Sequence, residues 1–312
     1  MKLARYQIPG SLTASLGIVS GLPGAESIVD VPRALAARGK GEAVASTMEA
    51  LVGAGPQGMD AIRELQAWAG SRLEPGWQLR GDDVQWLTPL PPRSCFAAGR
   101  NFGRHRMESI QGNPQAGANF HIDFPTGFIK LGRALVPHKA TVARPQDVLQ
   151  FDYEVEIAVV VGEPLFNVSR TRAREAIFGY TVFNDLSARE WQLAEMRNQL
   201  VLIGKNFPGF GPVGPYILTA DEVPDPTELV LWLEVNGERR QHSDCKDLIF
   251  GFDEMVAFWS HAGLEPGDLI STGTPDGVAL HRKPDPTPFF LKPGDIVHAG
   301  VDQIGVLETR IV

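Results

Sequence analysis

The apolar run at residues 151–162 is the most informative pattern in the chain, because it carries acidic side chains inside a hydrophobic stretch. Its β-branched and aromatic residues predict a strand, on which alternate side chains share a face. Glu154 and Glu156 therefore point the same way. Ala158 and Val160 continue their face and apolar residues fill the opposite one, so we expect a strand buried on both sides.

Two carboxylates on a buried strand require a compensating positive charge. Without one they would take up protons in a low-dielectric interior, whereas a hard divalent cation with oxygen ligands would keep them ionised. The alternative is an amphipathic strand whose acidic face lies in solvent, where most charged side chains are found. The apolar residues on both faces favour the cation.

The pattern elsewhere divides the chain into a small N-terminal unit and a larger one. Alanine-rich stretches at 42–53 and 58–69 predict helices in the first. The proline-rich connector at 87–92 cannot be helical. A chain of 312 residues exceeds the usual size of a single core. We therefore predict a small α+β domain at 1–85 and a larger domain at 86–312.

Short strands separated by glycine and proline dominate the larger domain. Residues 128–130 and 180–185 predict strands, and residues 229–235 followed by Asn236 and Gly237 predict a strand that enters a tight hairpin turn. Few helices interrupt this pattern. The fold class is therefore α+β and mainly β, with a barrel or roll of mixed strands.

Composition and charge narrow the function. With 43% hydrophobic and 21% charged residues the chain is an ordinary globular protein, and its net charge of -8 gives no basic footprint for nucleic acid. Cys95 and Cys245 have neither metal-site spacing nor the density of a disulfide scaffold, so we expect reduced, inert thiols. The N-terminus lacks the apolar core of a signal peptide and no run is long enough to span a bilayer, which predicts a cytoplasmic location without membrane contact.

A histidine and a glutamate three residues apart follow the connector. On a helical turn His105 and Glu108 would be neighbours, and a carboxylate beside an imidazole orients it and raises its basicity. That pair suits a general base that activates water. The alternative is a solvated surface turn. The loop-like composition of residues 111–117 also indicates a lid that closes on substrate.

A further carboxylate ends a predicted strand. Ser187 and Glu190 have the spacing of a capping box that begins a helix, so Asp185 is not needed as the cap and remains available as a metal ligand. On that helix Arg189 and Gln192 share a face near its positive end, which suits a carboxylate or an oxyanion. An ordinary exposed helix face is the alternative.

Two more segments carry candidate contacts for an anion. Lys205 lies in a glycine-bounded loop, where a solvated lysine is the simpler interpretation. Residues 271–277 include Thr274 and present hydroxyls and backbone amides, which suits either an anion site or a tight turn.

The order and spacing of these motifs resemble the fumarylacetoacetate hydrolase family from about residue 95 to residue 312, in particular its acylpyruvase and 2-hydroxyhepta-2,4-diene-1,7-dioate isomerase type. The resemblance is carried by Gly99-x-Asn101-Phe102-x-x-His105-x-x-Glu108, Asp152-Tyr153-Glu154-x-Glu156, Asn184-Asp185-x-Ser187-Ala188-Arg189, Gly204-Lys205, Leu264-Glu265-Pro266-Gly267-Asp268, Thr272-Gly273-Thr274-Pro275 and Leu291-Lys292-Pro293-Gly294-Asp295.

Position by position, the resemblance implies roles for these residues. According to the resemblance, the metal is Mg²⁺ or Mn²⁺, with Ca²⁺ as an alternative, and its ligands are Glu154, Glu156 and Asp185. The catalytic residues that it implies are His105, Glu108 and Lys205. The residues that it implies contact the substrate are Lys130, Arg189, Gln192 and Thr274. It also implies a mixed, rolled β-sheet and a homodimer. Family members that resemble the tyrosine-degrading enzyme carry another aspartate before the histidine, and its absence between Cys95 and His105 favours three carboxylates completed by water and substrate.

The chemistry that the resemblance implies acts on a small oxo acid. A 1,3-diketo acid would lose a C–C bond to water activated by His105 and Glu108, through a metal-stabilised enolate, with Lys205 and Gln192 at the oxyanion. Such hydrolases serve the catabolism of aromatic compounds. Decarboxylation of oxaloacetate and isomerisation or tautomerisation of 2-hydroxymuconate-type acids pass through the same enolate and remain alternatives. A catalytically silent metabolite-binding protein is a third, against which the retained His105 and Glu108 argue.

Overall fold

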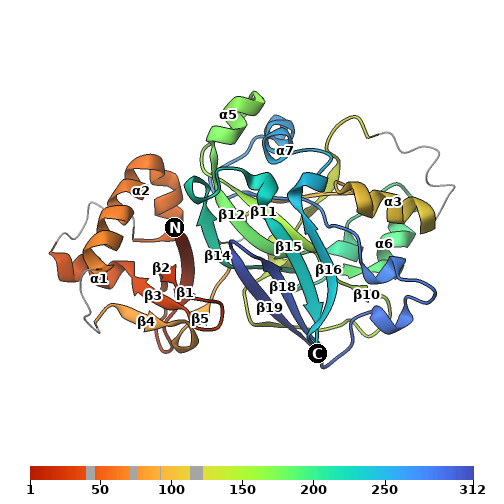
Figure 1. The fold of residues 1–312 in the computed structure, drawn as a ribbon, viewed down its shortest axis with the longest axis horizontal. Coiled ribbons are helices and arrows are strands. Elements are labelled where there is room, and N and C mark those ends of the chain that lie inside the picture. Colours follow the sequence, from red (N-terminus) through yellow and green to blue (C-terminus); the bar gives the residue numbers. More distant parts are fainter. Residues whose placement is uncertain (40–45, 71–75, 92, 113–121) are drawn as a thin grey trace.

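The computed structural model describes residues 1–39, 46–70, 76–91, 93–112 and 122–312, and its elements are arranged as Figure 1 shows. The strands of the large central sheet are β1 (Lys2–Gln7), β2 (Ala14–Ser20), β3 (Ser27–Asp30), β4 (Gln78–Arg80), β5 (Gln85–Trp86), β6 (Cys95–Ala98), β7 (Gly127–Lys130), β8 (Leu135–Val136), β11 (Val155–Val161), β12 (Ile177–Asn184), β14 (Gly211–Thr219) and β17 (Leu269–Ser271). Their order is β4-β3-β2-β1-β14-β12-β11-β17-β6-β7, with β5 beside β1 and β8 beside β14.

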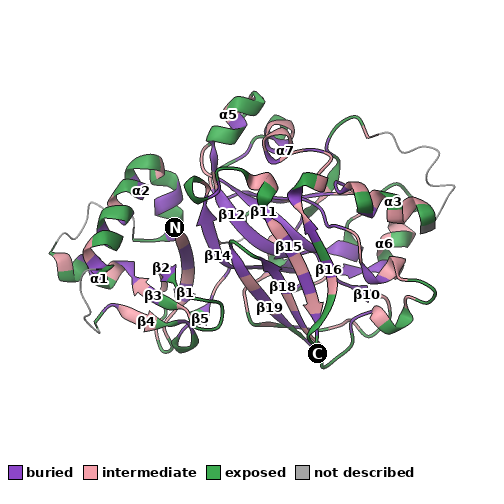
Figure 2. Ribbon diagram, in the orientation of Figure 1, coloured by how far each residue is buried: buried purple, intermediate pink, exposed green. Residues whose placement is uncertain are grey.

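A second sheet packs against the first. Its strands are β9 (Ala140–Val142), β15 (Val230–Val235), β16 (Glu238–Asp244), β18 (Ile296–Val301) and β19 (Gly305–Ile311), in the order β16-β15-β18-β19-β9. It contacts β11, β12 and β14 of the large sheet, and most residues of these three strands are buried (Figure 2). A short pair, β10 (Phe151–Asp152) with β13 (Ser187–Ala188), lies apart from both sheets. The predicted mixed, strand-rich fold is confirmed.

The helices lie around the edges of these sheets. They are α1 (Val31–Arg38), α2 (Met48–Gly70), α3 (Gly103–Gly112), α5 (Arg170–Glu175), α6 (Arg189–Met196) and α7 (Phe252–Trp259). Short 3₁₀ turns are η1 (Gly81–Asp83), η2 (Gly132–Ala134), η3 (Ile203–Lys205), η4 (Ala220–Glu222), η5 (Pro226–Glu228), η6 (Cys245–Asp247), η7 (Ser260–Ala262), η8 (Ala279–His281) and η9 (Thr287–Phe289). In Figure 1, α1 and α2 lie at one end of the molecule with β1–β5, and α3 and α6 lie at the other.

The N-terminal strands continue the central sheet. β1 is antiparallel to β14, with Leu3 opposite Ile217, so hydrogen bonds run from the N-terminal strands into the strands of the predicted larger domain. β5 spans the predicted boundary and also pairs with β1. Local patterns cannot reveal such long-range pairing. The boundary between residues 85 and 86 stays a prediction.

The predicted N-terminal helices correspond to α2. It breaks at Gly55, whose φ of 57° and ψ of -142° are not helical, and Pro56 begins the second stretch. Residues 42–45 of the first predicted helix lie outside the described residues. We did not predict α1, although it carries ordinary signals: Asp30 caps its start and Gly39, at a φ of 71°, ends it.

The central strand β11 is buried along its whole length, as its two apolar faces predicted. The predicted strand is nevertheless interrupted at residues 153 and 154. There the Asp152 carboxylate accepts a hydrogen bond from the Tyr153 N–H and the side-chain oxygen of Asn184 accepts one from the Glu154 N–H, in place of a neighbouring strand. The interruption leaves the Glu154 carboxylate at the end of the strand.

The predicted hairpin is confirmed. β15 and β16 pair around Asn236 and Gly237, whose φ values of 52° and 81° both lie in the left-handed region. A turn of this kind matches the twist of the flanking strands, and asparagine followed by glycine tolerates its backbone angles best.

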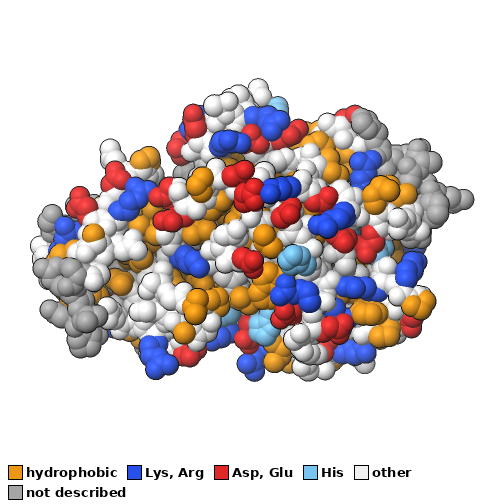
Figure 3. Space-filling view, viewed as in Figure 1, with side chains coloured by type: hydrophobic (Ala, Val, Ile, Leu, Met, Phe, Trp, Pro, Cys, Tyr) orange, Lys and Arg blue, Asp and Glu red, His pale blue; other side chains and the backbone are white. Residues whose placement is uncertain are grey.

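The surface charges, the hydrophobicity of the helices and the two cysteines can be compared with what the composition predicted. Acidic and basic side chains are intermingled over the face seen in Figure 3. Of the helices that the structure describes, none combines the length and hydrophobicity needed to cross a bilayer. Both cysteines are free and buried, and burial raises the pKa of each thiol, which explains why we expect them to be unreactive.

His138 gives the fold a pH-dependent stability. Its ring meets the Trp86 ring edge-on at 5.7 Å, and its Nδ1 accepts a hydrogen bond of 3.0 Å from the Glu308 N–H. Burial, and then the charge of Lys139, lower the pKa of His138 to about 4. Between pH 4 and 6.5 the unfolded chain therefore binds a proton that the folded chain excludes, and stability falls as the pH is lowered through this window.

We expect His138 to account for at most about 3 kcal/mol of that loss in the free energy of unfolding. His138→Asn keeps a hydrogen-bond acceptor without a titrating ring, so it should lose less stability than the wild type between pH 7.5 and 4.5. Urea denaturation at both pH values measures the difference. Equal losses in the two proteins would contradict the prediction.

Candidate active site

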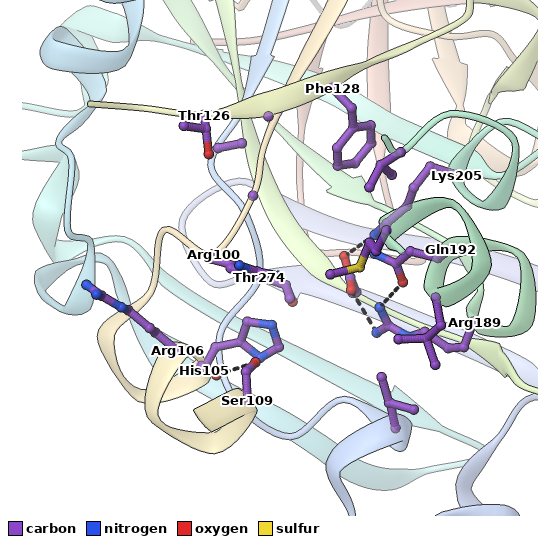
Figure 4. A pocket seen from close by; sticks show the side chains of 18 of the residues that line it. Arg100, His105, Arg106, Ser109, Thr126, Phe128, Arg189, Gln192, Lys205 and Thr274 are labelled. Atoms are coloured by element: carbon purple, nitrogen blue, oxygen red, sulfur yellow. Dashed lines mark hydrogen bonds and ion pairs between the residues drawn. The ribbon is translucent and has the colours of Figure 1, made fainter. Parts of the chain in front are cut away.

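A cavity of about 590 Å³ opens between α3, α6 and the strands β6 and β7. In Figure 4, Arg189, Gln192 and Lys205 lie on one side of it and His105 and Ser109 on the other. Its other polar and charged lining residues include Arg100, Arg106, Glu154, Glu156, Thr274 and His281. The predicted site residues that stand behind this lining are Glu108, Lys130 and Asp185.

The predicted metal ligands lie together beside the cavity. Glu154 precedes β11, Glu156 lies on it, and Asp185 follows the last residue of β12, the antiparallel neighbour. One oxygen of each carboxylate lies within 4.8 Å of the others, and all three side chains are buried. A strand and its neighbour thus deliver three acidic groups to one point.

Basic side chains hold two of these carboxylates. The Lys205 Nζ lies 2.6 Å from an oxygen of Glu154 and 2.6 Å from one of Asp185, and the Arg189 guanidinium lies 2.7 Å from Glu154. Burial alone would raise the pKa of Glu154, but Lys205 and then Arg189 hold it well below its ordinary value. Burial lowers the pKa of Lys205, but Asp185 and Glu154 raise it overall. Glu154 and Lys205 are therefore charged in the folded protein.

Glu156 differs from the other two carboxylates. Among the described residues it has no cation within ion-pair distance, and its side chain accepts a hydrogen bond from the Ser271 hydroxyl. Burial, followed by the charges of Asp185 and Glu154, raises the pKa of Glu156 well above its ordinary value. Three buried carboxylates, one of them without a cation, form the oxygen donor set that a hard divalent metal takes. The residues present therefore fit Mg²⁺ or Mn²⁺.

Lys130 supports the site from behind. Its Nζ lies 2.5 Å from Asp185 and donates to the backbone carbonyls of Phe210, at 2.6 Å, and Lys205. The side chain is completely buried. In this arrangement Lys130 positions Asp185, which differs from the substrate contact that the resemblance implies.

Asp152 is the structural centre of the site and was given no role on sequence grounds. Its carboxylate accepts hydrogen bonds from the N–H groups of Tyr153, Ala279 and Leu280, at 2.8 to 3.0 Å, and from the Arg189 Nε at 2.8 Å. It thereby fixes both the arginine that holds Glu154 and the η8 segment across the cavity. Only the tertiary structure reveals Arg189, Ala279 and Leu280 as partners, because they are 37 to 128 residues away along the chain.

Asp152→Asn should destabilise the fold more than an exposed charge change does. The variant leaves the buried Arg189 without its full counter-charge and turns an NH₂ donor toward N–H donors, so we expect a loss of about 3–5 kcal/mol in the free energy of unfolding. Urea denaturation measures it. Asp60→Asn breaks an exposed ion pair with Arg63 and is the control, with an expected loss below about 1 kcal/mol. Similar losses in both variants would contradict this role.

The His105–Glu108 pair lies on α3, where the predicted helical turn is confirmed. The His105 Nδ1 is 3.4 Å from a Glu108 oxygen, which also accepts a hydrogen bond of 3.2 Å from the Gly277 N–H. Burial alone would raise the pKa of Glu108, but His105 lowers it. An ionised carboxylate behind an imidazole is the arrangement of a general base. Residues 113–117 of the predicted lid lie outside the described residues.

The predicted capping box at the start of α6 is wrong. The Ser187 hydroxyl donates to the carbonyl of Asp185, and the Glu190 carboxylate accepts from the N–H groups of Leu149 and Gln150. Both side chains thus hold neighbouring loops and do not cap the helix. Asp185 is not a cap either, so its expected availability does not depend on the box.

Three other predicted substrate contacts line the cavity, and their role stays a prediction. The Arg189 guanidinium donates to the Gln192 side-chain oxygen at 2.8 Å, so these residues share a helix face at the cavity. The Thr274 hydroxyl lines the cavity, but it already donates to the Val155 carbonyl at 3.0 Å and accepts from Gln241 at 2.9 Å. Thr274 therefore helps to shape the cavity wall through the bonds of its hydroxyl to Val155 and Gln241.

Sequence reasoning missed His281, and it placed Ser271 in the 271–277 segment without predicting its contact with Glu156. Ser271 ends β17 opposite Ala158, which places its hydroxyl beside Glu156. His281 follows the Thr272-Gly273-Thr274-Pro275 motif by six residues, and a lone histidine in an irregular, proline-rich segment gave no local signal. The pairing of β11 with β17 and the turn at η8 were needed to find them.

Comparison with known proteins agrees with this fold and site. The model of the fumarylacetoacetate (FAA) hydrolase C-terminal family matches residues 94–312. A fumarylacetoacetate hydrolase domain-containing protein 2 homolog from Dictyostelium discoideum is 35% identical over 232 residues, which are 72% of this chain and 72% of that protein. A relative from Burkholderia multivorans is 43% identical over 162 residues, and the match spans 56% of its length and 52% of this chain.

Solved structures extend the likeness to the whole chain. The 2-hydroxyhepta-2,4-diene-1,7-dioate isomerase from Mycobacterium marinum is 26% identical, with a TM-score of 0.72 over 100% of this chain and 98% of that one. The fumarylpyruvate hydrolase from Pseudomonas aeruginosa, solved in complex with Mn²⁺ and pyruvate, is 29% identical, with a TM-score of 0.60 over 70% of this chain and 89% of that one.

Proposed function

The chain belongs to the fumarylacetoacetate hydrolase family, and from this premise we propose that it is a divalent-metal-dependent hydrolase that cleaves a C–C bond in an acylpyruvate-like 1,3-diketo acid. The observation that carries the proposal is that the His105–Glu108 pair and the three carboxylates serve the same cavity from different elements. A base for water and a site for a metal are the two requirements of this hydrolysis.

Glu154, Glu156 and Asp185 would hold Mg²⁺ or Mn²⁺, and the fumarylpyruvate hydrolase that this chain is similar to was solved with Mn²⁺. The bound cation supplies Lewis-acid polarisation of a 2-oxo acid. His105, backed by the Glu108 carboxylate, accepts a proton from water. Because the Gln192 oxygen accepts from Arg189, its NH₂ group is left to donate to an oxyanion, beside the Lys205 ammonium.

The arginines near His105 support an anionic group at the far end of the substrate. Arg100 and Arg106 line the cavity, and burial followed by the charge of Arg106 lowers the pKa of Arg100. Arg104 instead faces away, 3.6 Å from Asp247 and 3.5 Å from Asp276. A carboxylate bound by the first two would offset their mutual repulsion.

An isomerase is the second candidate, because the isomerase from Mycobacterium marinum is similar over the whole of this chain. Isomerisation or tautomerisation of an oxo-diacid uses the same 2-oxo carboxylate but needs no attack by water. Decarboxylation of oxaloacetate would likewise need no attack by water. The predicted homodimer and the predicted cytoplasmic location stay predictions.

A substrate panel tests the proposal. The purified protein is incubated with Mg²⁺ or Mn²⁺ and with acetylpyruvate, fumarylpyruvate, oxaloacetate or 5-carboxymethyl-2-hydroxymuconate, and the products are followed by NMR. We expect pyruvate and the matching carboxylic acid from the first two compounds. Turnover of oxaloacetate or of the muconate alone would replace the hydrolase with the corresponding alternative.

A further inference from the structure

A second histidine lies beside the predicted general base. His281 ends η8, lines the cavity, and its ring centroid is 5.6 Å from that of His105, with 53° between the ring planes. The backbone that carries it is fixed, since Asp152 accepts from the N–H groups of Ala279 and Leu280. His281 therefore has a defined place at the end of the cavity where water would be activated.

The hydrogen bonds of Ser109 determine which nitrogen of His281 carries a proton. The Ser109 hydroxyl donates its only proton to the His105 carbonyl, at 2.9 Å. The contact of 3.2 Å between this hydroxyl and the His281 Nε2 must then be donated by the histidine. In a neutral ring the Nδ1 is left with a lone pair. Among the described residues this Nδ1 has no hydrogen-bond partner.

His281 is neutral under ordinary conditions. Burial, and then the neighbouring His105, lower the pKa of His281 to about 4. The charged and titratable side chains that surround His281 are His105 and Glu108 on α3, Arg189 on α6, and Asp152 of β10. A neutral imidazole with an open Nδ1 is a hydrogen-bond acceptor and not an anion-binding cation.

We propose that His281 orients the attacking water, its Nδ1 accepting one hydrogen bond from the water while the His105 Nε2 accepts the other. This role rests on the proposed hydrolase function. Hydrogen bonds of about 2.9 Å allow one water to bridge two nitrogens up to roughly 5.8 Å apart. The centroids of the two rings are 5.6 Å apart, which leaves room for one water between the ring edges. Two acceptors direct both protons away from the carbonyl, so that a lone pair of the water faces it.

The step is balanced. The water oxygen forms a bond to the distal carbonyl carbon, and the proton that it held toward His105 passes to the Nε2. The C–C bond then breaks, its electron pair leaves with the pyruvate-like fragment, and the proton on His105 returns to the carbon that was released. The second proton of the water stays on its oxygen, and the His281 Nδ1 accepts a hydrogen bond from it. His281 therefore positions the nucleophile and neither gains nor loses a proton.

Two substitutions separate this role from simple packing. His281→Leu removes the acceptor and should lower kcat for acylpyruvate hydrolysis by roughly 10–100-fold, since a misplaced nucleophile costs about that much. KM should change by less than about threefold. His281→Asn places an oxygen close to the position of the Nδ1 and should restore most of the rate. Oxaloacetate decarboxylation, which needs no water attack, should stay close to the wild-type rate in both variants.

His261→Leu, which removes an exposed histidine of η7, is the matched control and should leave hydrolysis unchanged. Melting temperatures and calorimetric oxalate binding of the variants establish that fold and binding persist. In the metal-free protein, ¹⁵N NMR of the His281 ring should show the proton on Nε2. A proton on Nδ1, unaltered hydrolysis in His281→Leu, or equal losses of hydrolysis and decarboxylation would overturn the proposal.

The experiment distinguishes a failure of the proposed hydrolase function from a failure of the proposed role of His281. If the wild type hydrolyses no acylpyruvate, the hydrolase assignment is wrong and the water-orienting role falls with it. If the wild type hydrolyses acylpyruvates and His281→Leu does so equally well, the hydrolase assignment stands and only the role of His281 is refuted.

Discussion

Glu156→Gln is expected to abolish divalent metal binding while leaving the folded protein at least as stable as the wild type. Glu156 lies buried beside two other carboxylates and, within the described residues, has no cation of its own. Ionising Glu156 therefore costs free energy in the metal-free protein, and only the binding of a metal offsets that cost. Calorimetric titration with Mg²⁺ and Mn²⁺ measures the affinity, and urea denaturation measures the stability.

The neighbouring ligands give the contrast. Glu154→Gln and Asp185→Asn should also lose metal affinity and activity, but they leave Lys205 and Arg189, or Lys205 and Lys130, short of a buried counter-charge. Removing one partner of a buried pair costs about 3–5 kcal/mol. Metal affinity that is unchanged in all three variants would refute the site. A Glu156→Gln protein as unstable as Glu154→Gln would refute the charge argument.

Sequence patterns predicted the local parts of this molecule well. The burial of β11, the hairpin at Asn236 and Gly237, and the helical turn that joins His105 to Glu108 all depend on residues a few positions apart. Strand alternation also predicted that Glu154 and Glu156 point the same way, and their carboxylates do lie together, although Glu154 precedes the strand. In each case the period of the element is enough to place the side chains.

The long-range parts could not be predicted in this way. Ser187 and Glu190 have the spacing of a capping box, but the Ser187 hydroxyl donates to the nearby Asp185 carbonyl, and Glu190 accepts from the N–H of Leu149, about 40 residues earlier in the chain. Asp152 holds η8 across more than a hundred residues. Lys130 lies behind Asp185 because β7 ends beside the carbonyls of η3 and of Phe210. The roles of such residues depend on chain crossings, which local periodicity does not encode.

His105→Ala is expected to lower kcat for acylpyruvate hydrolysis by roughly 10²–10⁴-fold, which is the usual contribution of a general base. The fold should persist, because Glu108 still accepts from the Gly277 N–H and His281 still reaches Ser109. KM should change little, since Arg189, Gln192 and Lys205 lie on the other side of the cavity (Figure 4).

The reactions that need no water give the decisive comparison. Loss of CO₂ from oxaloacetate requires an electron sink and a later proton donor, but no base that activates water, so His105→Ala should retain most of that rate. His261→Ala, which removes an exposed ring, is the control for both reactions. If the wild type turns over only oxaloacetate, and His105→Ala retains most of that turnover, the C–C hydrolase assignment is wrong. The His105–Glu108 pair would then be an ordinary helix contact, and the carboxylates alone would define the activity.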